Sequence, residues 1–122
     1  MIYLGGPYSH DDHMVMEDRA HQQGVFAVHC ATMGHVVYCP VAAWHKWSFG
    51  YGLPMTPEFW RRMSLGILRV AVGLWVLKLD GWEASTGLKD EIRCASNLGI
   101  NISYFHPATY QSAIGRRTDS SL

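Results

Sequence analysis

The segment from Ala71 to Leu79 is the most apolar strand that the sequence predicts, and it constrains the fold more than any other feature. Strands that are apolar along their whole length occur at the centre of parallel sheets, where helices cover both faces. The longest apolar run, from Val70 to Leu77, is far too short to span a bilayer. A helical pattern that ends at Gly99 follows this strand, so the chain has the strand–helix alternation that builds such sheets.

The rest of the chain continues this alternation. The predicted elements are a strand at Ile2–Leu4 broken by Gly5-Gly6-Pro7, a helix that opens at Asp11–His13 and stops before Gly34, a strand at His35–Cys39 ended by Pro40, a loop at Val41–Met55, a helix with Thr56 as N-cap and Pro57 at its first position that runs to about Arg69, and a strand at Ile100–Phe105. We therefore predict a single-domain α/β fold, a doubly wound (Rossmann- or flavodoxin-like) parallel sheet of four to five strands with helices on both faces. The domain spans residues 1–108, and residues 109–122 form a polar tail.

Glu91 stands out in the helix that follows the apolar strand. At about 100° per residue, one face of this helix is apolar, formed by Leu88, Ile92, Cys94, Ala95 and Leu98. Glu91 falls near the middle of that face, and an unpaired buried charge costs several kcal/mol. The carboxylate is therefore a candidate for function at the sheet edge where ligands usually bind. The alternatives are a side chain that reaches out to solvent, or one that pairs structurally with a buried Tyr or Arg.

Composition excludes some classes of partner and favours others. The formal net charge is zero, so the chain lacks the basic surface that duplex nucleic acid requires. We expect no nucleic acid polymer and no membrane as partners. Zero charge, together with five Trp and six Met, favours a homodimer or higher homo-oligomer. Three cysteines without metal-type spacing, and an N-terminus unlike a signal peptide, favour buried thiols in the cytoplasm.

Three connections meet at one edge of the predicted sheet, at residues 5–10, 40–55 and 80–87. In the first, Gly5 and Gly6 allow a ligand to approach the backbone, although an ordinary turn explains them equally well. In the third, Ser85-Thr86-Gly87 begins a helix and offers free N–H groups to an anion, although Ser85 is also a plain N-cap. In the second lie several aromatic residues that suit either base stacking or an oligomer interface, namely Trp44, Trp47, Phe49 and Tyr51, with Trp60 following.

The histidines do not form a metal motif. His10, Asp11, Asp12 and His13 are consecutive, without the i, i+4 spacing of helical zinc sites. Helix-capping carboxylates in a surface loop explain these residues better. We expect no metal and no organic cofactor.

Two motifs together resemble a known family. Tyr3-Leu4-Gly5-Gly6-Pro7-Tyr8, followed by Ser85-x-Gly87-x-x-x-Glu91, resembles the nucleoside 2-deoxyribosyltransferase superfamily, which includes deoxynucleoside 5′-monophosphate N-glycosidases. Further segments look like a compact branch of it, namely Pro7-Tyr8-Ser9-His10, Gly34-His35-Val36-Val37, Tyr51-Gly52-Leu53-Pro54, Phe59-Trp60 and Gly81-Trp82-Glu83. The resemblance covers roughly residues 2 to 105.

The resemblance implies roles for individual residues. Glu91 corresponds to the carboxylate that attacks C1′ of the sugar, and Tyr3 to the tyrosine that orients it. Ser85 stands where transferases of free nucleosides have an aspartate and monophosphate hydrolases a serine, which implies a nucleoside 5′-monophosphate. The substrate-binding set that we expect is Gly5, Gly6, Pro7, Ser9, Arg19, His45, Trp60, Ser64, Ser85 and Gly87. Arg19 balances charge in this interpretation, or forms a surface ion pair.

One position departs from the family pattern. Ser64 stands where members usually carry an aspartate, which helps to protonate the leaving base or contacts the sugar. His45 is then a candidate for the acid that protonates the base. The expected activity is hydrolysis of the N-glycosidic bond of a (deoxy)nucleoside 5′-monophosphate. A deoxyribosyltransferase and a non-catalytic nucleotide-binding module are the alternatives.

Overall fold

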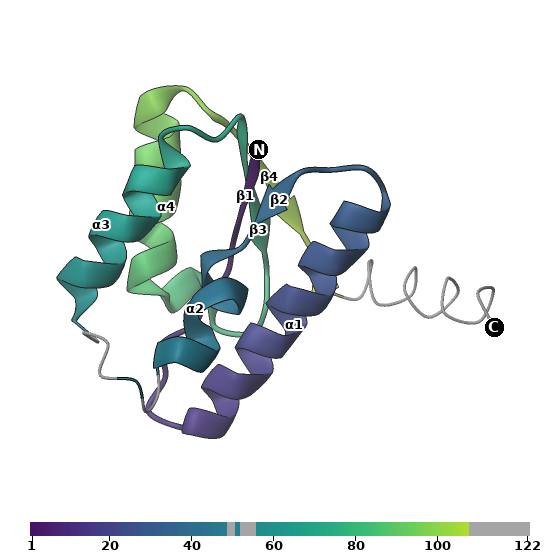
Figure 1. Ribbon diagram of the computed structural model, residues 1–122. Coiled ribbons are helices and arrows are strands. Elements are labelled where there is room, and N and C mark those ends of the chain that lie inside the picture. The colour runs from purple at the N-terminus through teal and green to yellow at the C-terminus, as the bar shows by residue number, and fades with distance from the viewer. Residues whose placement is uncertain (49–50, 52–55, 108–122) are drawn as a thin grey trace, which may run out of the picture.

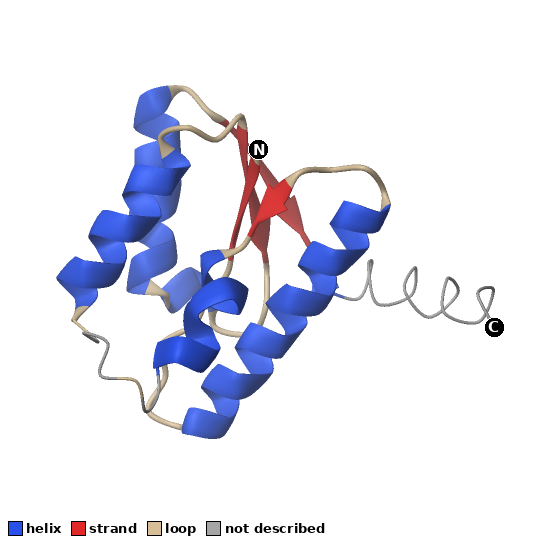
Figure 2. Ribbon diagram, in the orientation of Figure 1, coloured by secondary structure: helices blue, strands red, loops and turns tan. Residues whose placement is uncertain are grey.

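The computed structural model, which describes residues 1–48, 51 and 56–107, has a parallel sheet at its centre. The strands of the described residues are β1 (Ile2–Gly5), β2 (Val37–Tyr38), β3 (Gly73–Leu77) and β4 (Asn101–Phe105). They lie in the order β2-β1-β3-β4, and every pairing is parallel. Helices lie on both sides of the strands (Figure 2). The predicted doubly wound α/β fold is confirmed.

Helices divide between the two faces of the sheet (Figure 1). Helix α1 (His13–Thr32) covers one face, and α3 (Pro57–Leu68) and α4 (Thr86–Leu98) cover the other. Helix α2 (Pro40–Ser48) packs against α1, and the short 3-10 helix η1 (Trp82–Ala84) leads into α4. Because every strand is parallel, each crossover leaves the sheet at the edge where the carboxyl ends of the strands gather and returns the chain to the opposite edge.

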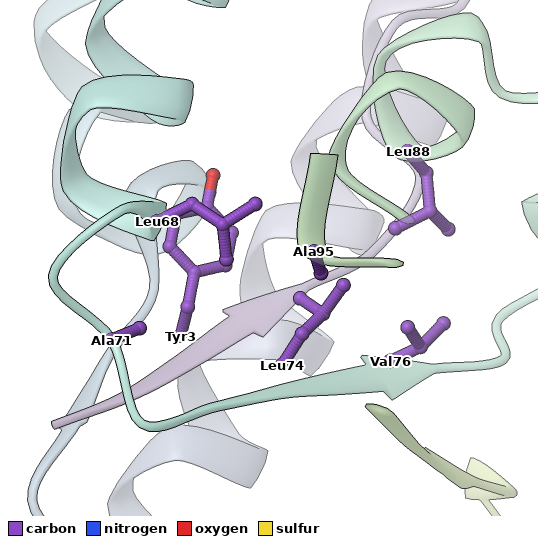
Figure 3. Packing of buried hydrophobic residues seen from close by; sticks show 7 residues of the cluster. All are labelled: Tyr3, Leu68, Ala71, Leu74, Val76, Leu88 and Ala95. Atoms are coloured by element: carbon purple, nitrogen blue, oxygen red, sulfur yellow. The ribbon is translucent and has the colours of Figure 1, made fainter. Parts of the chain in front are cut away.

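The side chains of β1 alternate between two separate cores. Tyr3 faces α3 and α4, where it packs with Leu68, Leu74 and Leu88 (Figure 3). Leu4 faces α1 instead and belongs to the cluster that contains Phe26. Each fully buried leucine of this kind contributes roughly 1.5–3 kcal/mol of hydrophobic free energy. Because β1 is buried on both faces, Tyr3 is fixed in position before any ligand arrives.

Three helix starts follow the prediction. Thr56 accepts a hydrogen bond from the backbone N–H of Phe59 at 3.3 Å, with Pro57 at the first helical position. Asp12 caps α1 by accepting from the N–H of Met14 at 2.9 Å, which confirms the capping role of this acidic stretch. Ser85 caps α4, and Gly99 ends it. The cap hydroxyl of Ser85 is thereby placed at the carboxyl edge of the sheet.

The predicted loop from Val41 to Met55 is wrong over its first half. Residues Pro40–Ser48 form α2, because Pro40 occupies the start of a helix, where its missing N–H costs nothing. The N–H of Ala43 donates to the carbonyl of Cys39 at 3.0 Å and closes the first turn. Residues 49–50 and 52–55 of the predicted loop, Phe49 included, lie outside the described residues, as does the predicted tail at 109–122.

Smaller departures have local causes. The strand predicted at His35–Cys39 pairs only over Val37–Tyr38, because the N–H of His35 instead donates to the carbonyl of Cys30 and finishes α1. Leu98, predicted on the inward face of α4, is 48% exposed near the end of that helix. Cys30 and Cys39 are buried as predicted, whereas Cys94 is partly exposed, and all three are free thiols. In the described part of the chain, no helix combines the length and apolarity needed to cross a membrane.

Candidate active site

Glu91 lies above the carboxyl end of β1, on the second turn of α4. A Cβ atom added to Gly5 would stand 3.6 Å from Glu91 Oε2 and 3.2 Å from Leu88 Cδ1. The carboxylate is therefore in van der Waals range of position 5, where the closest atom to such a Cβ belongs to Leu88. Strand β1 is also where the strand order reverses, with β2 on one side and β3 on the other. Ligands of doubly wound sheets bind at such a switch point.

Two hydroxyl groups connect Glu91 to α3. The Tyr3 hydroxyl hydrogen-bonds the Glu91 carboxylate, and the Ser64 side chain hydrogen-bonds Tyr3. Tyr3 is 1% exposed, so its hydroxyl has no recourse to bulk water. A buried tyrosine hydroxyl requires a hydrogen-bond partner, and Glu91 supplies one here. The three residues come from β1, α3 and α4, and they meet on the face of the sheet that those helices cover.

Burial controls the protonation of this group of residues. Burial raises the pKa of Glu91 to about 7, the Tyr3 hydrogen bond opposes that rise, and the neighbouring charge of Asp90 adds to it. Glu91 retains partial exposure, so the carboxyl group is shielded but not sealed off. Burial also raises the pKa of Tyr3 far above its ordinary range, and the Glu91 charge raises it further. Tyr3 thus remains a hydrogen-bond donor, while Glu91 titrates near neutral pH.

Gln23, which the sequence analysis missed, packs against the turn formed by Gly5, Gly6 and Pro7. Its side chain is fully buried, and its amide donates to the carbonyl of Pro7 at 2.8 Å and accepts from Cys39 Sγ at 3.6 Å. A Cβ at Gly6 would stand only 2.7 Å from the Gln23 side chain. The available signal was its spacing: Gln23 lies three residues after Ala20 and three before Phe26, on the buried side of α1. The space beside Gly6 is filled by protein.

The start of α4 is open on its outer side. Ser85 Oγ accepts from the N–H of Leu88 at 3.3 Å, which is the N-cap bond expected from the sequence. Gly87 is exposed, and no atom lies within 4 Å of a Cβ built on it. Apart from the Leu88 N–H, which Ser85 holds, the first turn of α4 is exposed and carries the partial positive charge of the helix end. An anion can approach here without displacing a side chain.

Arg19 joins the first and third connections of the carboxyl edge. Its guanidinium donates to the carbonyls of Ser9 and Asp80, each at 3.0 Å, and to that of Tyr8 at 3.4 Å. These partners are backbone carbonyls, so the surface ion pair considered from the sequence is not what holds this residue. Gly81 adopts φ +85°, and a Cβ there would stand 2.6 Å from the guanidinium. Ser9 itself is exposed and contributes its carbonyl to this clamp.

Aromatic rings of α2 and α3 contact one another. Trp60 precedes Ser64 by one helical turn, and its ring lies 6.5 Å from that of Trp44 and 5.0 Å from that of Phe59. Trp44 Nε1 donates to the Tyr38 hydroxyl at 2.8 Å, which fixes the indole. Trp47 instead contacts Tyr51 on the exposed side of α2. Of the predicted aromatic set, Trp60 is therefore the ring that lies one turn from Ser64 on α3, and Trp44 is in contact with it.

His45 is held in a separate group of polar residues. Its Nδ1 lies 2.7 Å from the Tyr8 hydroxyl and its Nε2 lies 2.8 Å from Glu17 Oε1. A surface hollow of about 640 Å³ lies between α1 and α2 and is lined by Glu17 and His45. Glu91 and its two hydroxyl partners are not part of its lining, so the hollow is separate from the shielded carboxyl group. His10 accepts from the N–H of Asp12 at 2.9 Å.

Comparison with known proteins shows a family. Residues 1–107 match the model of the family described as Domain of unknown function (DUF1937). The match covers most of the chain, and the chain belongs to this family. No curated protein matches it.

Proposed function

We propose that the protein hydrolyses the N-glycosidic bond of a nucleoside or deoxynucleoside 5′-monophosphate, with Glu91 as the nucleophile. The observation that carries the proposal is the shielded Glu91 carboxyl group, hydrogen-bonded by the Tyr3 hydroxyl at the switch point of the sheet. A structural carboxylate would be expected to pair with a cation. The partner of Glu91 is instead a neutral donor, which leaves the negative charge available to an electrophilic carbon.

The first chemical step is attack of ionised Glu91 on C1′ of the sugar. A covalent glycosyl–enzyme ester forms as the bond from C1′ to the base nitrogen breaks, and the electron pair of that bond leaves with the base. Tyr3 keeps the attacking oxygen in place and favours the charged form of the carboxylate. Because the pKa of Glu91 is about 7, a substantial fraction of the protein carries the nucleophile at neutral pH.

The second step releases the sugar phosphate. Water attacks C1′ of the ester, its proton is lost to solvent or to a nearby base, and Glu91 is restored as a carboxylate. A second nucleotide base in place of water would make the same intermediate serve a transferase. Partial exposure of Glu91 gives water a route to the ester, and this favours hydrolysis.

The opening of α4 supports a monophosphate as substrate. Ser85 and the open backbone at Gly87 offer a hydroxyl and N–H groups at a helix N-terminus, one to two turns before Glu91. Charge-assisted hydrogen bonds of this kind suit a phosphate. Trp60, one turn before Ser64 on α3, and Trp44 beside it would stack on the base. Pro7, Ser9 and Arg19 belong to the wall of the site in this proposal.

A nucleotide-binding module without turnover is the second candidate. It is favoured by Ser64, a neutral hydroxyl bonded to Tyr3 at the position where the resembling enzymes carry an aspartate. This candidate predicts tight binding of a monophosphate and no release of base. A cytoplasmic location and a homodimer are parts of the proposal that rest on the free thiols and on exposed apolar side chains such as Val70 and Val72.

Release of free base from a panel of ribo- and deoxyribonucleoside 5′-monophosphates, followed by chromatography, tests the proposal. Glu91→Gln should abolish release and retain binding. Asp90→Asn is the matched control, because it removes the adjacent carboxylate, which pairs with Arg93 at 3.3 Å, and should retain release. Release that survives in Glu91→Gln would remove this residue from the mechanism. Binding without release in the wild type would favour the second candidate.

A further inference from the structure

A chain of polar groups runs from the carboxyl edge of the sheet to the protein surface. The Tyr8 hydroxyl hydrogen-bonds His45 Nδ1 at 2.7 Å, and the buried His45 Nε2 lies 2.8 Å from Glu17 Oε1, where a protonated imidazole forms an ion pair with the carboxylate. The three residues come from three segments: the β1–α1 connection, α2 and α1. Both nitrogens of the imidazole are thus engaged, with a hydroxyl on one side and a carboxylate on the other.

The exposure of the side chains to solvent differs along this chain of residues. The side chain of Glu17 is 53% exposed, that of His45 is only 10% exposed, and Tyr8 is half-buried. Glu17 therefore contacts solvent, while the imidazole is enclosed between α1 and α2. His13 Nε2 is also close to Glu17 Oε1, at 3.7 Å, and the Ser48 side chain hydrogen-bonds Tyr8. The chain connects bulk water to a single phenolic hydroxyl through one buried ring.

Tyr8 lies on the connection that leaves β1 directly after Gly5, the neighbour of Glu91. It follows Gly5, the residue beneath the Glu91 carboxylate, by three positions, so their Cα atoms are at most about 10 Å apart. Its carbonyl is held by Arg19, which also holds the carbonyl of Asp80 at the end of β3. The backbone of Tyr8 is thereby fixed at the same edge as the rest of the candidate site. A base that leaves C1′ would depart into this region.

Resting on the proposed function, we propose that Tyr8 donates the proton that the departing base requires, and that His45, held by Glu17, supplies the proton to Tyr8. Tyr8 is the catalytic residue of this group, because its hydroxyl would donate directly to the base nitrogen. His45 and Glu17 are positioning and proton-supplying residues.

The step balances without a further reactant. As Glu91 attacks C1′ and the C1′–N bond breaks, the electron pair moves to the base, whose nitrogen takes the Tyr8 proton. The imidazolium of His45 passes its Nδ1 proton to the phenolate oxygen, and the Glu17 carboxylate stabilises the imidazolium until that moment. The proton released by water in the second step returns to His45 by way of Glu17. Burial raises the pKa of Tyr8, so the hydroxyl holds its proton at neutral pH.

The test compares two substrates with different leaving groups. An ordinary purine nucleoside 5′-monophosphate requires protonation of its base, whereas an N7-methylated purine nucleotide releases a neutral base without any proton. Tyr8→Phe should lower kcat for the ordinary substrate by roughly 100-fold or more and leave the methylated substrate within about threefold. His45→Gln should show the same selective loss, which a merely structural role would not produce. Tyr104→Phe, a half-exposed tyrosine on β4, is the matched control and should affect neither substrate.

Each outcome is decisive. Equal loss on both substrates, or no loss on either, in folded Tyr8→Phe protein would overturn the assignment of Tyr8. Wild-type protein that releases only the methylated base would also overturn it, because no proton donor would then operate, while the role of Glu91 would stand. Wild-type protein inactive on both substrates would refute the proposed hydrolase itself, and this proposal with it. Thermal unfolding of every variant shows whether it is folded before rates are compared.

Discussion

Glu91→Gln should stabilise the protein at alkaline pH while abolishing its activity. Burial raises the pKa of Glu91 from 4.5 to about 7, so the folded protein binds this proton more tightly than the unfolded chain does. The contribution of Glu91 to stability is therefore complete below pH 4.5 and is lost as the pH rises toward 7. Glutamine keeps the shape of the protonated acid and never ionises, so the variant should not suffer this loss.

The magnitude follows from the two pKa values. A tenfold change in an ionisation constant is worth about 1.4 kcal/mol, so the full effect is about 3 kcal/mol. Part of this stabilisation is already lost at pH 5, and the partial exposure of Glu91 makes the remainder smaller. The loss of stability between pH 5 and pH 8 is therefore roughly 2 kcal/mol. At pH 5, the free energy of unfolding of the variant should exceed that of the wild type only slightly. At pH 8, this difference should be larger by roughly 2 kcal/mol.

Urea titrations of the two proteins at several pH values measure this difference. Asp90→Asn serves as control, because the Glu91 carboxyl group is intact in it and its stability should still fall with rising pH. A gap between Glu91→Gln and the wild type that is constant from pH 5 to pH 8 would refute the reasoning. It would mean that the carboxyl group is as well solvated in the folded state as in the unfolded chain.

Three further predictions concern neighbouring residues. In the wild type, kcat/KM should rise with pH through about 7 as Glu91 ionises. Tyr3→Phe removes the hydrogen bond to the charged form and should move that rise to higher pH. An unchanged midpoint would mean that Tyr3 does not influence the ionisation of Glu91. Gly6→Ala should destabilise the protein by roughly 2 kcal/mol through collision with Gln23, and a second change, Gln23→Ala, should relieve part of that loss in urea titrations; strict additivity would mean that the two do not meet. Ser85→Ala should cost about 1 kcal/mol of stability through loss of the N-cap bond, whereas Ser85→Asp should keep the cap yet weaken binding of a monophosphate far more than of a nucleoside in calorimetry; equal weakening would exclude a phosphate contact.

Periodicity and capping signals made much of the fold predictable. The apolar pattern around Gly73–Leu77 indicates a central strand, and Thr56 and Ser85 mark helix starts, because an N-cap hydroxyl before an apolar repeat has one common structural use. The inward position of Glu91 follows from helical spacing alone. These features depend on contacts between residues close in sequence, which is why the sequence reveals them.

The features that sequence reasoning missed depend on distant contacts. Pro40 was interpreted as the end of a strand, although a proline also fits the first turn of a helix, and only packing of α2 on α1 decides between the two. Gln23 meets Pro7 and Cys39, each sixteen residues away, and no local pattern indicates that a glutamine is fully buried. The partners of His45 are of the same kind, since Tyr8 is thirty-seven residues distant.

The central position of β1 has a consequence for the order in which the molecule forms. Ile2 pairs with Gly73, so β1 has to wait for its β3 partner until about 70 further residues have been made. At about 5–20 residues per second, that delay is roughly 4–14 s. During this time Leu4 and Tyr3, buried on opposite faces in the finished sheet, have only the α1 and β2 segments to cover them. Until β3 has been synthesised, the apolar residues of β1 are thus a binding site for chaperones, and the carboxyl-terminal half of the domain is needed to bury them.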